Sequence, residues 1–217
     1  MNKEEAMEMI LSVLSDPNNL KIQEELLDTF LKFGIALMEG GNRKVQKTIY
    51  DYCVSFPRSE IMFKRLYTLI QNQIDKLKAD AQPSSEDLFD NSRQGTQFFL
   101  FQLEEENSDD RQDLNEKIVE KILRFLQLFT EGHYLELQNY VRFQKNNFNS
   151  YDLVAIITEL LLTYSSNMTQ KIYENILKCL DTLTEFVQGP CPENQISLID
   201  GKFLEVAYKI LSVRLPS

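Results

Sequence analysis

The chain has 217 residues, of which 43% are apolar, and it carries a formal net charge of −10 with a pI of about 4.7. Its apolar content excludes an intrinsically disordered chain, and its length allows one large domain or two small ones. The acidic balance argues against nucleic-acid binding, because a protein that holds phosphates needs a basic patch. The sequence has no long cluster of Lys and Arg that would supply one.

The cysteine and histidine content limits the possible metal and redox sites. Cys53, Cys179 and Cys191 are widely spaced and odd in number, which is typical of reduced thiols in a cytosolic protein. No pair has C-x-x-C spacing and His133 is the single histidine, so no structural zinc site is expected. We also expect no signal peptide and no membrane insertion, because no stretch approaches the roughly 18 apolar residues of a membrane span.

The first 80 residues are predicted to form an N-terminal helical segment, 1–80. Apolar residues recur at helical spacing over 4–15, 20–38, 42–55 and 60–78. Gly40 and Gly41 are predicted to end the second helix, Asn42 to cap the third and Ser59 to cap the fourth.

Residues 81–111 have a different composition and are predicted to form an acidic linker. Residues 79–111 contain nine acidic and two basic residues, and a Pro-Ser-Ser run begins at Pro83. A short apolar run at 96–103 is predicted to be an ordered island that docks on a neighbouring element.

Helical spacing returns in the last part, 112–217, which is predicted to be a second helical domain. Helices are expected from Asp113 to about Glu131, over 133–144 and 151–164, from a cap at Asn167 or Thr169 to Gly189, and over 193–199 and 202–213. No stretch alternates with a period of two residues, so no sheet is expected. About ten helices joined by short turns predict an all-α fold, either an armadillo-like α-solenoid or an irregular helical bundle.

The motifs of common enzymes are absent from the sequence. There is no G-x-S-x-G motif and no Gly-rich phosphate loop, and the single histidine has no evident nucleophile partner. We therefore expect that the protein is not an enzyme.

Two glutamates stand where helices are predicted to end. Glu131 precedes Gly132, and Glu185 lies four residues before Gly189. A carboxylate is disfavoured there by about 0.3–1 kcal/mol, because the helix dipole is already negative at its C-terminus. A calcium ion would turn this repulsion into attraction and could also use the free carbonyls of a helix end. Spacing alone favours the simpler interpretation, in which both are ordinary surface residues.

Several stretches of the chain resemble the intracellular calcium-release channels. ILRFLQL at 122–128, the E-x-H triplet at 131–133, LQNYVRFQKNNFNSYDLV at 137–154 and LTEFVQGPCPENQ at 183–195 resemble the RIH-associated region of inositol trisphosphate receptors, which ryanodine receptors share. GGNRKVQKTIYDYCVSFPRSEIMFKRL at 40–66 resembles the segment just before it in inositol trisphosphate receptors.

This resemblance implies a cytosolic helical solenoid that transmits ligand signals to the pore of a tetrameric channel of the endoplasmic reticulum. It also implies the activating calcium site of that family. When the family's calcium-site motifs are matched to this sequence, the implied ligands are Glu131 and Glu185. His133 and Gln188 lie beside them in the same motifs and would orient the carboxylates. The family usually has E-N-H, and Gly132 replaces that asparagine here.

The sequence is compatible with two functions. In the first, the chain is a module of a calcium-release channel, with other segments or subunits of the channel as partners. A further carbonyl ligand then comes from another part of the channel, so this sequence carries a partial calcium site. In the second, the chain is a free-standing, soluble cytosolic scaffold that binds protein partners and has no channel function.

Overall fold

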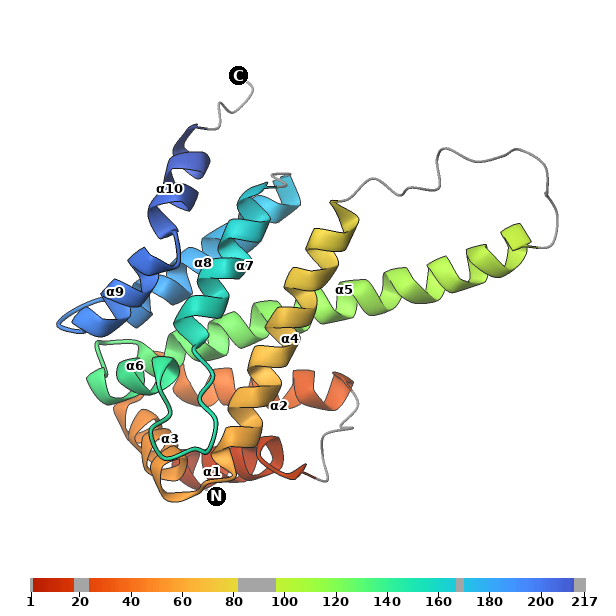
Figure 1. Cartoon of the computed structure of the whole chain (residues 1–217). Coiled ribbons are helices and arrows are strands. Elements are labelled where there is room, and N and C mark those ends of the chain that lie inside the picture. The colour runs from red at the N-terminus through yellow and green to blue at the C-terminus, as the bar shows by residue number, and fades with distance from the viewer. Residues whose placement is uncertain (1, 18–23, 82–96, 167–169, 213–217) are drawn as a thin grey trace.

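The computed structural model describes residues 2–17, 24–81, 97–166 and 170–212, and it is helical throughout (Figure 1). No strand occurs in these ranges. The helices described are α1 Lys3–Leu14, α2 Glu24–Met38, α3 Arg43–Ser55, α4 Ser59–Asp80, α5 Gln97–Thr130, α6 Leu135–Arg142, α7 Leu153–Ser166, α8 Gln170–Val187, α9 Pro192–Asp200 and α10 Phe203–Ser212. The all-α prediction of about ten helices is confirmed, and the arrangement is that of an α-solenoid-like helical bundle.

Local capping explains where the N-terminal helices begin. Asn2 and Glu5 form a capping box at α1, each side chain bonding the other's backbone N–H. The Asn42 side chain accepts from the N–H of Val45, so the predicted cap of α3 is confirmed. The predicted cap at Ser59 is wrong. Ser59 is the first residue of α4, after the N-cap Arg58, and its buried hydroxyl donates to the carbonyl of Cys53.

The C-terminal half of the long helix α5 lies among the other helices, and its N-terminal half projects to one side of them (Figure 1). It packs against α2 on one side and α8 on another, and also contacts α3, α4 and α6. The helix predicted to begin at Asp113 begins earlier, at Gln97, and is continuous to Thr130. Residues 82–96 of the predicted linker lie outside the described residues, and residues 97–111, with most of the predicted island, are part of α5. The division into domains stays a prediction.

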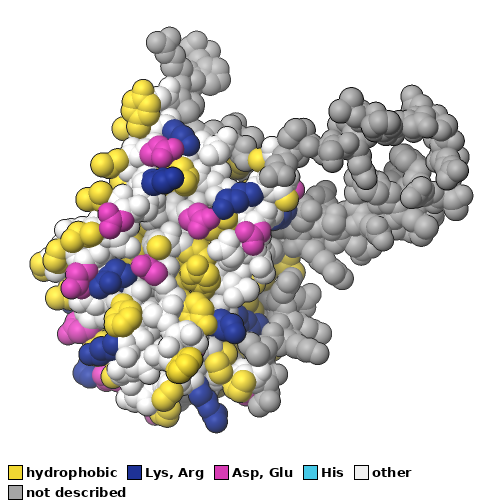
Figure 2. Space-filling model, viewed as in Figure 1, with side chains coloured by type: hydrophobic (Ala, Val, Ile, Leu, Met, Phe, Trp, Pro, Cys, Tyr) yellow, Lys and Arg dark blue, Asp and Glu magenta, His cyan; other side chains and the backbone are white. Residues whose placement is uncertain are grey.

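A single hydrophobic core joins the helices from α1 to α10. The very apolar α7 packs against α4, α8, α9 and α10. Helices α9 and α10 lie at one edge, where Figure 2 shows hydrophobic side chains on the surface. The exposed apolar residues of these two helices are Ile196, Ile199, Leu204, Tyr208 and Leu211. Over the described ranges, none of the helices combines the length and apolar content that a bilayer crossing requires.

The C-terminal ends of α5 and α8 both lie against the short helix α6, which contacts each of them. Gly132, His133 and Gly189, just beyond these ends, have positive φ angles of 75°, 62° and 88°. Glycine adopts this left-handed conformation without cost, whereas a histidine adopts it only when its surroundings hold it there. These turns bring the predicted site residues to one end of the bundle.

Candidate functional site

Glu131 is the residue that directly follows α5, and its side chain is half-buried. Its Oε2 atom is buried and has no hydrogen-bond partner. The turn between α2 and α3 lies against this carboxylate, since a Cβ atom placed on Gly41 would be 3.8 Å from Glu131 Cδ. A buried carboxylate oxygen without a partner costs free energy, so this position is unfavourable for the chain alone.

Glu185 lies in the last turn of α8 and is also half-buried. Its Oε2 atom is likewise buried without a hydrogen-bond partner. Burial and the negative charge of Glu131 raise its pKa above the usual 4.5, although the backbone N–H of Gly132 and the charges of His133 and Arg124 act in the opposite direction. The structure therefore brings the two carboxylates from separate helix ends close enough to repel each other.

The other two predicted residues lie beside this pair. The His133 ring packs on the turn after α8, with Nδ1 3.5 Å from the position of a Cβ atom on Gly189. Gln188 is exposed, and its backbone carbonyl accepts a hydrogen bond from Gln138. The electrostatic contact between His133 and Glu185 places the histidine near the pair, whereas an orienting role for the Gln188 side chain stays a prediction.

The backbone carbonyls at both helix ends accept hydrogen bonds from side-chain amide groups. The sequence alone did not indicate these hydrogen bonds. Gln46 of α3 is fully buried, and its Nε2 donates to the carbonyls of Leu128 and Glu131, both at 2.9 Å. Gln138 of α6 is also fully buried, and its Nε2 donates to the carbonyls of Glu185 and Gln188, both at 2.8 Å. The expectation that these ends offer free carbonyls is therefore wrong for the Glu131 and Glu185 carbonyls.

Residues from α9 complete the cap on α8. Asn194 Nδ2 donates to the carbonyls of Gln138 and Phe186 at 2.6 and 2.9 Å, and Gln195 Nε2 donates to Val187 and Gly189, both at 3.0 Å. The amides of the PENQ stretch thus fix the end of α8 and, with it, the position of Glu185. Their hydrogen-bonding partners lie in other elements, so spacing along the chain gave no signal for them.

The chemistry of the two carboxylates is compatible with part of a calcium site, and the site itself stays a prediction. Each has an oxygen that is buried without a partner, and calcium prefers carboxylate, carbonyl and water oxygens. Two carboxylates provide at most four of the roughly six to eight oxygens that calcium takes. The described residues contain no group of three or more His, Cys, Asp or Glu side chains placed to hold a metal. Water or another segment would have to supply the other ligands.

Comparison with known proteins identifies the region that carries this pair. A family model described as "RyR and IP3R Homology associated" matches residues 113–211. The chain is 28% identical over 236 aligned positions to the inositol 1,4,5-trisphosphate receptor itr-1 of Caenorhabditis elegans. That alignment covers 80% of this chain and 8% of the relative. Residues 113–211 therefore belong to the RyR and IP3R homology associated family, and over most of its length the chain is similar to an inositol trisphosphate receptor.

Proposed function

We propose that this chain is a cytosolic helical module of an intracellular ligand-gated calcium-release channel. In this role Glu131 and Glu185 form part of an activating calcium site, and the helices that carry them pass the signal toward the pore. The observation that carries the proposal is the pair of half-buried carboxylates at two helix ends, each with a buried oxygen that has no partner.

A calcium ion between the carboxylates would remove their repulsion. The free chain holds two like charges close together at the negative ends of two helix dipoles, and burial raises the pKa of Glu185 further. A divalent cation reverses the sign of each of these interactions. The imidazole of His133 and the amide of Gln188 would orient the carboxylates around the ion.

The packing of α5 on α8 gives the site a mechanical connection to the rest of the bundle. Thr182 Oγ1 lies 3.1 Å from the carbonyl of Leu123, and Asn175 Nδ2 lies 2.7 Å from Glu116 Oε1. Any change in the distance between Glu131 and Glu185 would therefore shift the two helices along a shared, hydrogen-bonded interface.

The remaining ligands and the pore belong to partners in this proposal. Other segments or subunits of a tetrameric channel would complete the calcium site, at the cytosolic face of the endoplasmic reticulum membrane. The chain itself has no catalytic role in this scheme and does not insert into the membrane.

Calcium titration of the purified chain tests the site. We expect calcium to raise the melting temperature of the wild type and to displace terbium, an oxygen-seeking cation that is detected by its luminescence. Glu131→Gln with Glu185→Gln should abolish both effects. Glu136→Gln with Glu174→Gln, two exposed positions, is the matched control and should respond as the wild type does.

Equal calcium and terbium responses in the wild type and the site variant would contradict the proposed site. The channel role is tested separately by fractionating cells with an antibody to this region. A very large membrane-bound protein is expected, whereas a soluble band near the 25.4 kDa of the chain would instead support the free-standing scaffold.

A further inference from the structure

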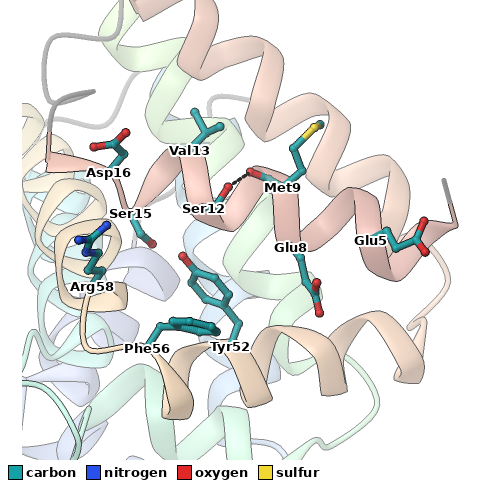
Figure 3. A pocket seen from close by; sticks show the side chains of 10 residues that line it. All are labelled: Glu5, Glu8, Met9, Ser12, Val13, Ser15, Asp16, Tyr52, Phe56 and Arg58. Carbon is teal, nitrogen blue, oxygen red and sulfur yellow. Dashed lines mark hydrogen bonds between the residues drawn. The ribbon is translucent and has the colours of Figure 1, made fainter.

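A groove that shares no lining residue with the carboxylate pair lies between α1 and the end of α3 (Figure 3). Its volume is about 830 Å³. Ten residues line it, namely Glu5, Glu8, Met9, Ser12, Val13, Ser15, Asp16, Tyr52, Phe56 and Arg58. Between Glu5 and Asp16 the groove follows roughly 16 Å of helix α1, which is enough for a short peptide segment.

The middle of the groove is apolar. Tyr52 and Phe56 occupy one face of the last turn of α3, with ring centroids 5.0 Å apart, and Met9 lies opposite them on α1. Phe56 is 54% exposed and Met9 is 43% exposed, so these large side chains remain accessible to a ligand. An apolar side chain placed between them would bury surface on both helices.

The two ends of the groove differ in charge. In Figure 3, Glu5 and Glu8 lie at one end, whereas Asp16 and Arg58 lie at the other. Among the ten lining residues, all of which the structure describes, Arg58 is the single cation against three carboxylates. The end at Glu5 and Glu8 is therefore negative, and it favours a positively charged group.

A buried hydroxyl group marks the opposite end. Ser15 caps the C-terminus of α1 and is 1% exposed, yet its Oγ has no hydrogen-bond partner. Figure 3 shows this side chain on the side of α1 that faces the groove. A buried hydroxyl without a partner is unfavourable, so a ligand that offers it a polar group is stabilised at this point.

We propose that this groove binds a basic, amphipathic segment of a partner protein. A Lys or Arg of the segment pairs with Glu5 and Glu8, an aliphatic or aromatic side chain sits between Met9 and the Tyr52–Phe56 pair, and a polar group reaches the Ser15 hydroxyl. Charge complementarity favours a basic segment, because the lining residues of the groove carry three carboxylates and one cation.

Selection from a random library of displayed peptides of about 12 residues, a length that spans the groove, tests the proposal on the full chain. We expect the selected peptides to contain Lys or Arg beside a large apolar residue. Glu8→Lys and Phe56→Ser should each weaken their binding at least about tenfold. Both positions are exposed, so the variants should fold, as circular dichroism can check.

Matched changes elsewhere control for charge and apolar surface. Glu174→Lys on α8 and Tyr208→Ser on α10 alter exposed residues of helices that do not line the groove, and they should leave binding unchanged. The proposal is overturned if no peptide is selected, if the selected peptides lack basic residues, or if Glu8→Lys and Phe56→Ser bind them as the wild type does. Self-association of the chain that Phe56→Ser abolishes would also overturn it, because a second copy would then be the occupant.

Discussion

Glu131 and Glu185 lie at the ends of two different helices, and burial together with the negative charge of Glu131 raises the pKa of Glu185. The packing of α5 against α8 brings them together, and Gly132 and Gly189 adopt left-handed conformations in the turns that follow. The repulsion is a product of tertiary structure, and it leads to the first prediction.

Replacing Glu185 with an isosteric amide should stabilise the isolated chain at neutral pH. Because the folded-state pKa of Glu185 is raised above 4.5, the wild type loses stability relative to Glu185→Gln as the pH rises from 4.5 through that raised value. At pH 7 we expect a gain of about 0.5 kcal/mol, the usual size of a like-charge penalty near a helix end, or about 1–2 °C in melting temperature. Thermal unfolding between pH 4 and 7 measures it.

The exposed carboxylate of Glu174 provides the control for this experiment. Glu174→Gln should leave the pH dependence of the melting temperature as it is in the wild type. A Glu185→Gln variant whose stability relative to the wild type is the same at pH 4 and pH 7 would show that Glu185 ionises freely.

Gln138 should be essential for the end of α8. Gln138→Met keeps the volume but removes the Nε2 donor that bonds the carbonyls of Glu185 and Gln188. Leaving these carbonyls without a donor should lower the free energy of unfolding by about 2 kcal/mol. Gln71→Met removes an exposed amide that bonds only Asp75 in the next turn, and it should cost under about 0.5 kcal/mol. Urea unfolding of both variants measures these changes. Equal losses of unfolding free energy in the two variants would contradict the capping role of Gln138.

Gly34 allows the close approach of α2 to α5. A Cβ atom at this position would lie 2.6 Å from Cε2 of the fully buried Phe125. Gly34→Ala should therefore lower the free energy of unfolding by about 1–2 kcal/mol, even though alanine favours a helix more than glycine does.

Replacing Phe125 with the smaller leucine should remove the clash with residue 34. In a Phe125→Leu background the added methyl group has room, so Gly34→Ala should be neutral or stabilising there. A double-mutant cycle by chemical denaturation measures the coupling. Additive effects of the two substitutions would show that the two side chains do not compete for this space.

Asp28 of α2 pairs with Lys121 of α5 and with Lys32 one turn along its own helix. Burial opposes its ionisation, yet Lys121 and Lys32, each 2.6 Å away, hold its pKa below 3.8. Its contribution to stability is therefore complete above pH 3.8 and is lost as the pH falls through the lowered pKa. Asp28→Asn should cost about 1 kcal/mol at pH 7 and little at pH 2.

The pair Lys47–Asp51 on α3 is the comparison for Asp28. Both side chains of that pair are more than half exposed, at 66% and 55%, so Asp51→Asn should change stability by a few tenths of a kcal/mol at most. If both aspartate variants lose the same free energy of unfolding at pH 7, the contact of Asp28 with α5 stabilises the fold no more than an exposed ion pair does.

Much of the secondary structure was predictable because it depends on local sequence. The spacing of apolar residues predicted the approximate position of the helices along the chain. The cap at Asn42 and the end of the second helix at Gly40 and Gly41 follow from the side-chain and backbone preferences of a few neighbouring residues. The start of α5 was misjudged, because acidic composition argued for a linker whereas the helix begins at Gln97. Ser59 was misassigned as a cap, since its hydroxyl found a partner in another helix.

The all-α fold, the family resemblance of the C-terminal region and the two glutamates at unfavourable helix ends could be predicted from the amino-acid sequence. The proximity of these carboxylates, and the hydrogen bonds that the buried amides of Gln46 and Gln138 donate to nearby carbonyls, became visible only in the folded chain. The reason is physical: helix periodicity and capping depend on residues a few positions apart. The charges and hydrogen bonds of the site join residues that the chain separates by several helices, and packing alone brings them together.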